Sequence, residues 1–314
     1  MNERTSPDHP LIAIVGPTAV GKSEVALELA ERFDGEIVSA DSRQIYRGMD
    51  IGTAKPTPEQ QARVPHHLID VTDPDRPLTL AEYQRMAYTT IEEIHRRGRL
   101  PFLVGGTGLY VWAVIEGWQI PPVPPDPKLR RTLEERACRE GSRALYEELR
   151  RLDPEAASFI HPHNVRRVIR ALEVCYQTGK PFSAQRRKHP PPYRTILIGL
   201  TRPRVELYRR IDERMKQMIA QGLVEETRRL ADRYPWDLPA MTGLGYRQIG
   251  AYLRGEISLE EAIRQIQTAT RDFVHHQYNW FRQNDPRIRW FDLSQEDVEA
   301  IAQWLRRKLR EADG

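Results

Sequence analysis

The chain has 314 residues, 39% of them hydrophobic and 29% charged, and a formal net charge of +4, so it can bury the core of one large domain or of two unequal ones. No apolar run approaches the roughly 18 to 20 residues that cross a bilayer, the N-terminus lacks the apolar stretch of a secretory signal, and two cysteines are too few for a zinc finger or a disulfide framework. We therefore expect a cytoplasmic protein with no membrane partner and with free thiols.

The first part of the chain alternates apolar strands with helical segments. Three apolar runs have the length of buried strands: residues 11–15, 36–40 and 101–104. They end at Gly16, Asp41 and Gly105, and residues 22–33 carry apolar positions at helical spacing. This alternation is typical of βαβ units in a parallel sheet, whose ligands bind at the carboxyl ends of the strands. We expect Gly16, Asp41 and Thr107 to face one crevice.

Two proline clusters, residues 120–127 and 189–193, interrupt the pattern and are typical of semi-rigid connectors. Between them, residues 126–190 hold fifteen Lys or Arg against nine Asp or Glu, which gives this segment the basic excess of the chain. Its periodicity predicts helices over residues 129–151 and 164–178 and shows no strand signal. The segment is therefore interpreted as an inserted helical domain.

The strand pattern returns after the insert, at residues 196–200. Three helical patterns follow it: residues 204–234, 258–283 and 295–311. We predict an α/β fold, in which residues 1–122 and 194–314 form a P-loop NTPase-like core with a parallel sheet and C-terminal helices, and residues 123–193 form an inserted all-helical domain.

A phosphate-binding loop lies between the first strand and the first helix. The sequence GPTAVGKS at residues 16–23 satisfies G-x-x-x-x-G-K-[ST] in the required strand–loop–helix context. Backbone amides and the helix N-terminus attract phosphate oxygens, Lys22 adds a charge, and the Ser23 hydroxyl can bind Mg²⁺. The residues expected to hold a diphosphate or triphosphate are Gly16, Thr18, Ala19, Val20, Gly21, Lys22 and Ser23.

The loop does not identify the reaction. Most proteins that carry it are NTPases or kinases, which usually place a metal-binding Asp at the end of an apolar strand. Here the run at residues 101–104 ends in Gly-Gly-Thr, and the polar neighbours of Asp41 are more typical of a substrate-reading loop. The residues alone leave Asp41 open as a general base, a helix N-cap or a magnesium ligand.

Several motifs together resemble the tRNA dimethylallyltransferase family, also called isopentenyltransferases. The resemblance extends over residues 11–282, includes the helical insert, and is closest to the bacterial form because no Cys/His finger follows the core. The motifs are GPTAVGKS at residues 16–23, SADSRQIYRGMDIGTAKP at 39–56, VGGTGLY at 104–110 and GYRQ at 245–248.

The resemblance implies transfer of a dimethylallyl group from dimethylallyl diphosphate to the exocyclic amino group of the adenosine directly 3′ of the tRNA anticodon. Arg214 would join the loop and Mg²⁺ in stabilising the departing diphosphate. Asp41 would accept the proton of the weakly nucleophilic amine, and Thr107 would hydrogen-bond near that amine or the bridging oxygen. The target base has to be extruded from the stacked anticodon loop.

Residues expected to contact tRNA combine matching family positions with basic, polar or aromatic character. Along the late helix, Arg271, His275, Tyr278 and Arg282 have the spacing of one stripe. The predicted tRNA-binding set is Asp41, Ser42, Arg43, Gln44, Thr107, Arg130, Arg166, Arg167, Arg170, Thr242, Gly245, Tyr246, Arg247, His275, Tyr278 and Arg282.

Three alternatives stay open at this stage. A P-loop kinase of a small metabolite would turn over ATP and have no need of the basic insert. A cytokinin-type adenylate prenyltransferase shares the core but acts on a free nucleotide. A non-catalytic RNA-binding module would not depend on Asp41. For the enzyme acting on an anticodon loop, we expect a monomer.

Overall fold

The computed structural model describes residues 9–121, 123–185, 188–189 and 193–311. The chain divides into two compact units, a core unit of residues 1–115 and 191–314 and an insert unit of residues 116–190. The insert unit begins and ends a few residues before the predicted insert of residues 123–193, because its connecting segments pair with each other through an antiparallel bridge between Trp118 and Lys188.

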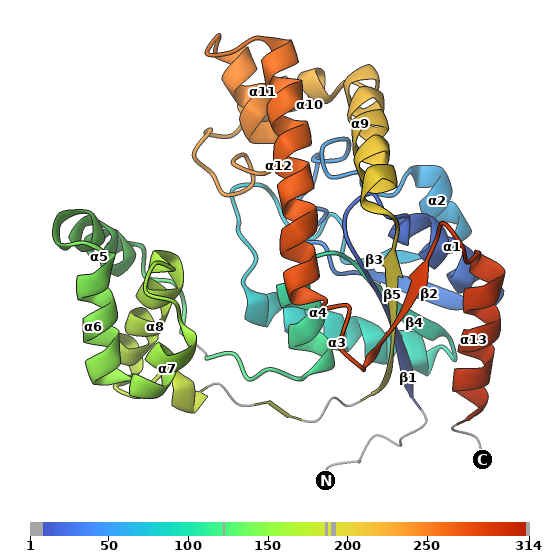
Figure 1. The fold of residues 1–314 in the computed structure, drawn as a ribbon, viewed down its shortest axis with the longest axis horizontal. Coiled ribbons are helices and arrows are strands. Elements are labelled where there is room, and N and C mark those ends of the chain that lie inside the picture. The colour runs from blue at the N-terminus through green and yellow to red at the C-terminus, as the bar shows by residue number, and fades with distance from the viewer. Residues whose placement is uncertain (1–8, 122, 186–187, 190–192, 312–314) are drawn as a thin grey trace. The chain divides into compact units, whose positions relative to one another are not determined.

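The core unit is built on a six-stranded sheet with the strand order β3-β2-β4-β1-β5-β6, and every pairing is parallel (Figure 1). The strands are β1 (Pro10–Val15), β2 (Gly35–Ser39), β3 (His66–His67), β4 (Leu100–Val104), β5 (Arg194–Thr201) and β6 (Ile288–Asp292). The aliphatic side chains of the central β1 are fully buried, which explains its continuous rather than alternating apolar sequence. The predicted α/β class is confirmed, and β3 and β6 are additions to the predicted strands.

Helices cover both faces of this sheet, with α1 and α13 on one side and α3 and α4 on the other (Figure 1). The helices of the core unit are α1 (Lys22–Arg32), α2 (Pro58–Arg63), α3 (Leu80–Arg96), α4 (Gly108–Ile115), α9 (Arg204–Ala220), α10 (Leu223–Ala231), α11 (Tyr246–Leu253), α12 (Leu259–Trp280) and α13 (Val298–Arg310). The single helix predicted over residues 204–234 is wrong, because Gly222 has a φ of +99° and separates α9 from α10. None of the helices within the described residues is long and apolar enough to cross a membrane.

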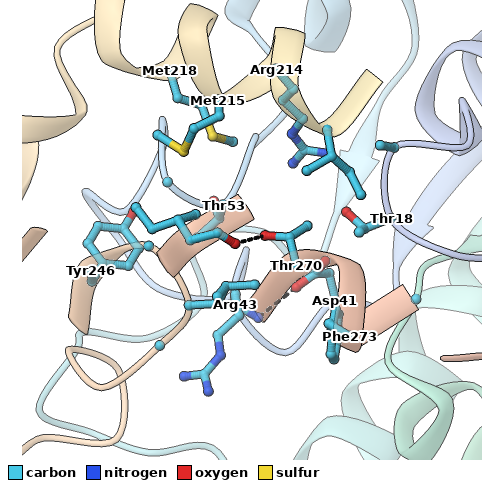
Figure 2. A pocket seen from close by; sticks show the side chains of 18 of the residues that line it. Thr18, Asp41, Arg43, Thr53, Arg214, Met215, Met218, Tyr246, Thr270 and Phe273 are labelled. Atoms are coloured by element: carbon cyan, nitrogen blue, oxygen red, sulfur yellow. Dashed lines mark hydrogen bonds between the residues drawn. The ribbon is translucent and has the colours of Figure 1, made fainter. Parts of the chain in front are cut away.

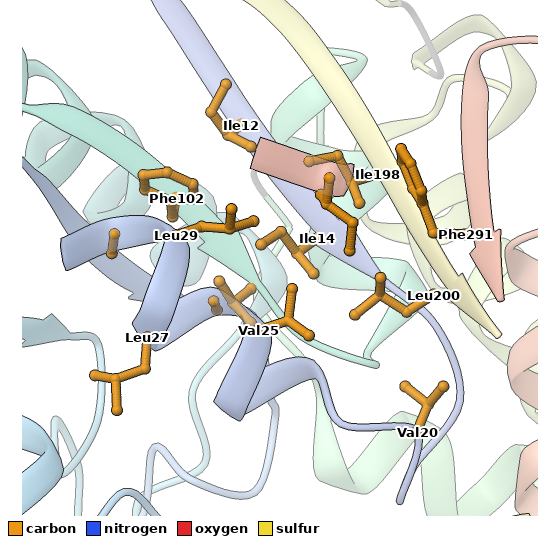
Figure 3. Packing of buried hydrophobic residues seen from close by; sticks show 14 of the residues in the cluster. Ile12, Ile14, Val20, Val25, Leu27, Leu29, Phe102, Ile198, Leu200 and Phe291 are labelled. Carbon is orange, nitrogen blue, oxygen red and sulfur yellow. The ribbon is translucent and has the colours of Figure 1, made fainter. Parts of the chain in front are cut away.

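The main hydrophobic core lies between the sheet and α1. Ile12 and Ile14 of β1 and Phe102 of β4 are fully buried in one cluster with Val25 and Leu29 of α1 (Figure 3). Each buried aliphatic side chain contributes about 1.5–3 kcal/mol relative to an exposed one. This packing fixes the helix that begins at Lys22 against the strands whose carboxyl ends face the site.

The insert unit is helical and has a hydrophobic core of its own. Its helices are α5 (Pro127–Glu140), α6 (Ser142–Leu152), α7 (Pro154–Phe159) and α8 (Val165–Thr178). Leu133, Leu145, Leu149 and Leu172 pack together and are almost completely buried. The single helix predicted over residues 129–151 is wrong, because the chain turns at Gly141, where φ is +85°.

Candidate functional site

The phosphate loop leaves β1 through a glycine that no other residue can replace without a shift of the backbone. A Cβ atom on Gly16 would lie 2.5 Å from the carbonyl oxygen of Leu200, and φ at Gly16 is +145°. Gly21 also has a positive φ, of +112°, and precedes α1 without supplying a side-chain cap. The first amides of α1 are therefore left for an anion rather than for a capping side chain.

The loop is oriented by three cations that bind its carbonyl oxygens. Lys22 Nζ donates to the carbonyls of Gly16 (3.0 Å) and Pro17 (2.8 Å). Arg210 Nε donates to Ala19 O at 2.7 Å, and Arg202 Nε donates to Val20 O at 2.9 Å. Neither Arg202 nor Arg210 was predicted from the sequence as a site residue. The one feature that indicates them is a basic cluster after the apolar run at residues 196–200.

With its carbonyls bound, the loop directs its amides elsewhere. None of the described residues accepts a hydrogen bond from the amides of Ala19, Val20, Gly21 or Lys22. A cluster of free amides at a helix N-terminus is a binding site for phosphate oxygens. The geometry of residues 16–23 thus agrees with the predicted role of the loop.

The charges at the loop favour an anionic ligand. Burial lowers the pKa of Lys22 to about 8; the Asp41 carboxylate partly opposes this effect, and the Arg214 guanidinium adds to it. Burial also lowers the pKa of Arg214 below its ordinary value. Two partly buried cations held close together are stabilised by a polyanion such as a diphosphate.

Asp41 and Thr107 lie after the ends of neighbouring strands, β2 and β4, and Thr107 forms hydrogen bonds with the two residues that flank Asp41. Thr107 Oγ1 accepts from the Ser42 amide at 3.0 Å, and the Thr107 amide donates to Ala40 O at 3.2 Å. Asp41 Oδ1 accepts from the Arg43 amide at 2.8 Å, which fixes the direction of the carboxylate. Parallel strands thus bring the two predicted catalytic residues together.

A buried glutamine from α12 links this pair of strand ends to the phosphate loop. Gln277 Oε1 accepts from the Thr18 amide at 2.8 Å, and Gln277 Nε2 donates to Gly106 O at 3.1 Å. Only 3% of Gln277 is exposed. The sequence analysis missed this residue, since a lone glutamine in an amphipathic helix carries no signal of its distant partners.

A cavity of about 370 Å³ opens beside these groups, with a polar and an apolar end. Asp41 and Arg43 line it from the strand end, and α9 contributes Arg214, Met215 and Met218 (Figure 2). The apolar part of the lining is Ile211, Met215, Met218, Leu223, Leu244, Ile266 and Phe273. Such a mixed lining suits a ligand that joins an anionic group to a small apolar one.

A second cavity, of about 910 Å³, meets the first at the phosphate loop. It contains Lys22 and Ser23, which do not line the first cavity. The two cavities share Thr18, Asp41 and Arg214. A ligand on the phosphate loop can therefore be approached from two sides.

The other predicted tRNA-binding residues of the core unit differ in exposure and in their hydrogen bonds. Arg43, Thr242 and Arg247 are exposed, and Arg43 Nη1 donates to Pro239 O at 2.8 Å, in the segment before Thr242. Gln44 is instead turned inward: its Nε2 donates to the carbonyls of Thr53 (3.3 Å) and Ala54 (3.1 Å), and its Oε1 accepts from Ser39. In this structure Gln44 holds its own loop together, and its predicted contact with tRNA stays a prediction.

The side chain of Tyr246 is likewise bound within the protein. Its side chain is buried, and its hydroxyl donates to Glu226 Oε1 at 2.7 Å. The Glu226 carboxylate also accepts from the amides of Asp50 (3.0 Å), Ile51 (2.8 Å) and Gly52 (3.0 Å). Gly245, which has a φ of +93°, precedes Tyr246 and starts α11. Tyr246 also lines the first cavity, and its predicted contact with tRNA stays a prediction.

In the insert unit, two of the four predicted arginines are paired within the protein. The Glu173 side chain is completely buried and accepts from Arg130 at 2.8 Å and from Arg170 at 2.5 Å. These two arginines neutralise a carboxylate while their side chains stay partly exposed, and the predicted contact of all four arginines with tRNA stays a prediction. Arg166 and Arg167 are exposed on α8, and Arg167 lies over the ring of Phe159 at 5.7 Å.

The residues of the predicted stripe along α12 make contacts within the protein, and their contact with tRNA stays a prediction. Arg271 pairs with Asp212 at 2.8 Å, and the Tyr278 hydroxyl shares a hydrogen bond of 2.8 Å with Thr201 Oγ1. His275 Nε2 lies 3.2 Å from the hydroxyl of Tyr208, and Arg282 follows the end of the helix. These residues face α9 and β5 because α12 packs against α9.

The chain is similar in sequence to known proteins over nearly its whole length. The family model described as IPP transferase matches residues 44–284, and the isopentenyl transferase model matches residues 9–72. A tRNA dimethylallyltransferase of Roseiflexus sp. is 54% identical over 302 residues, covering 94% of this chain and 99% of the relative. One from Thermomicrobium roseum is 53% identical over 313 residues, covering 99% and 94%.

Solved structures give the same result. A full-length tRNA isopentenylpyrophosphate transferase from Bacillus halodurans superposes with a TM-score of 0.72 at 45% identity, over 96% of this chain and 97% of that one. A eukaryotic dimethylallyltransferase, described as acting on tRNA, gives a TM-score of 0.79 at 27% identity, over 95% and 78%. Both similarities extend over nearly the whole chain.

Proposed function

The chain belongs to the IPP transferase family, and on this premise we propose that it transfers the dimethylallyl group of dimethylallyl diphosphate to tRNA. The acceptor is the exocyclic amino group of the adenosine directly 3′ of the anticodon. The observation that carries the proposal is the meeting, in one cavity, of the phosphate loop, the Asp41 carboxylate and an apolar wall. The kinase, adenylate prenyltransferase and RNA-binding alternatives are not favoured by the relatives.

The phosphate loop binds the leaving group. As the allylic carbon–oxygen bond breaks, negative charge accumulates on the departing pyrophosphate and is stabilised by Lys22, Arg214 and the free amides of the loop. Removal of one such donor in other enzymes costs about 10²–10³ in rate. Binding is also favourable for the protein, because the pyrophosphate relieves the repulsion between the two partly buried cations.

Asp41 acts as the general base for the attacking amine. The lone pair of an adenine amino group is delocalised into the ring, so the nitrogen becomes acidic only as its bond to carbon forms. The nitrogen–carbon bond forms while the carbon–oxygen bond breaks; pyrophosphate leaves, and the surplus proton passes to the Asp41 carboxylate. Thr107, held against Ser42, contributes a hydroxyl at the same place.

The apolar side of the cavity holds the dimethylallyl group. Met215 and Met218 of α9 project towards it (Figure 2), and Ile211 and Ile266 extend the same wall. Unbranched methionine side chains adapt to a small branched alkenyl group. Their contact also excludes water, which would otherwise compete with the amine for the allylic carbon.

Mg²⁺ fits the donor set beside the loop. The Ser23 hydroxyl lies at the start of α1 and lines the second cavity, where it would supply an oxygen ligand next to the expected phosphates. When bound, the ion neutralises part of the pyrophosphate charge. We expect transfer to stop on chelation by EDTA and to return with added Mg²⁺.

The anticodon loop is held by exposed cations. Arg43 and Arg247 stand next to the cavity in the core unit, and Arg166 and Arg167 lie on α8 of the insert unit. Exposed arginines suit phosphate contacts and stacking on extruded bases. Ser42 and Thr242 offer hydroxyl groups in the same segments as Arg43 and Arg247.

Incubation with dimethylallyl diphosphate, Mg²⁺ and an unmodified tRNA transcript tests the proposal by detection of prenylated adenosine in nuclease digests. Asp41→Asn should lose turnover by about 10²-fold or more while it still binds the donor, because an amide cannot take up the proton. Asp272→Asn on the exposed face of α12 is the matched control. Product from free adenylate alone, or ATP turnover alone, would instead establish one of the alternatives.

A further inference from the structure

Gln277 is the one side chain described here that binds both the phosphate loop and the loop after β4. Its carbonyl oxygen accepts from the Thr18 amide at 2.8 Å, and its amide nitrogen donates to Gly106 O at 3.1 Å. The residue lies on α12, far from both partners in sequence, and is 3% exposed. A buried amide with both of its functional groups bound is held rigidly in place.

Gln277 approaches the backbone of the loop after β4 closely. A Cβ atom on Gly106 would lie 2.2 Å from Gln277 Nε2 and 3.6 Å from Lys22 Nζ. A Cβ on the preceding Gly105 would lie 2.1 Å from Ala40 O. The absence of side chains at both glycines therefore allows the phosphate loop, the Gly106 carbonyl and the Asp41 strand end to approach closely.

Hydrogen bonds continue from the bridge to the proposed base. Thr107 follows Gly106, and its backbone amide and hydroxyl bind Ala40 and Ser42, on either side of Asp41. Gln277 thus connects the amides that hold the leaving group to the segment that holds the base. An in-line substitution requires the nucleophile, the carbon and the leaving oxygen to be aligned, and a displacement of about 1 Å can cost 10²-fold in rate.

On the basis of the proposed function, we propose that Gln277 is a positioning residue that sets the separation between the leaving-group cradle of residues 16–23 and the Asp41–Thr107 pair. Gln277 lines the cavity, but both functional groups of its amide are bound to Thr18 and Gly106, so in this role it acts through these two partners. Its loss should therefore change the rate of the chemical step more than the binding of the donor, which depends on Lys22, Arg214 and the free loop amides.

The test uses Gln277→Met in the full-length protein, because methionine keeps the length and approximate volume of glutamine but forms neither hydrogen bond. We expect the kcat of prenyl transfer, per folded molecule, to fall about 100-fold while the KM for dimethylallyl diphosphate changes less than about threefold. Gln265→Met is the matched control: Gln265 lies on the exposed side of α12 and bonds only Glu261. Its kcat should stay within about twofold of the original value.

Three results would overturn the inference: an unchanged kcat in a folded Gln277→Met protein, a rise in KM that exceeds the fall in kcat, or an equal loss in Gln265→Met. If Gln277→Met does not fold, Gln277→Asn serves instead, since its shorter side chain has the same groups but cannot reach both partners. A wild-type protein without prenyl transfer would refute the proposed function itself, whereas an active wild type with an equally active variant refutes only the role of Gln277.

Discussion

The phosphate-loop site and the insert unit place charge in opposite ways. In the insert unit the Glu173 carboxylate is enclosed and paired with Arg130 and Arg170. At the phosphate loop, by contrast, Lys22 and Arg214 form no ion pair with any carboxylate of the described residues, and burial lowers the pKa of both. Paired buried charges maintain a fold, while an excess of partly buried cations beside free amides marks a binding place for an anion.

Replacement of Lys22 should give the largest effect. Lys22→Met removes a charge that has no structural carboxylate partner, so we expect kcat/KM for the donor to fall about 10²–10³-fold with little change in unfolding temperature. Lys216→Met, at an exposed position of α9, is the control. Steady-state kinetics and thermal unfolding of both variants measure the difference. A large loss of stability in Lys22→Met would remove the distinction between the two units.

Replacement of Glu173 should have the converse effect. Glu173→Gln leaves two arginines without their carboxylate, which we expect to lower the free energy of unfolding by about 3 kcal/mol, near the lower end of the usual range because both arginines are partly exposed. Urea unfolding measures this loss. Pyrophosphate binding to the phosphate loop, followed by calorimetry, should be unaffected, and a parallel loss of binding would show that the two units are not independent.

The pH dependence of kcat/KM for dimethylallyl diphosphate tests whether Lys22 binds the donor as a cation. Because the pKa of Lys22 is lowered to about 8, the side chain is charged below that pH and neutral above it in the free protein. We expect kcat/KM for the donor to decline about tenfold per pH unit above pH 8. Lys22→Arg, which keeps its charge, should lack this decline. A flat profile in the wild type would contradict the assignment.

The smallest effect is expected at an exposed arginine of the insert unit. Arg166→Ala should raise the KM for tRNA about fivefold and reduce the salt dependence of tRNA binding by about one unit of slope, through loss of one phosphate contact. Stability should be unchanged. Arg130→Ala is the informative partner, since it should destabilise the insert unit through Glu173. Equal behaviour of the two variants would mean that burial does not distinguish their roles.

Site residues could be predicted from the sequence where they belong to a local motif or lie at the ends of neighbouring strands. The phosphate loop is a local motif, and the proximity of Asp41 to Thr107 follows from parallel strands. Residues that bind a distant part of the chain could not be predicted from the sequence. Gln277, Arg210 and Glu226 each bind a segment more than 170 residues away. Basic composition likewise could not distinguish Arg166 from Arg130, because only the fold places a buried carboxylate beside one of them.

The Glu226 carboxylate has a consequence for the motions of the protein. It binds the amide hydrogens of three successive residues, Asp50 to Gly52, from a helix that lies far along the chain. Those three hydrogens can exchange with solvent only when the carboxylate departs, so they become exchangeable in a single event. We therefore expect residues 50–52 and α10, which are far apart in sequence, to open together as one cooperative unit.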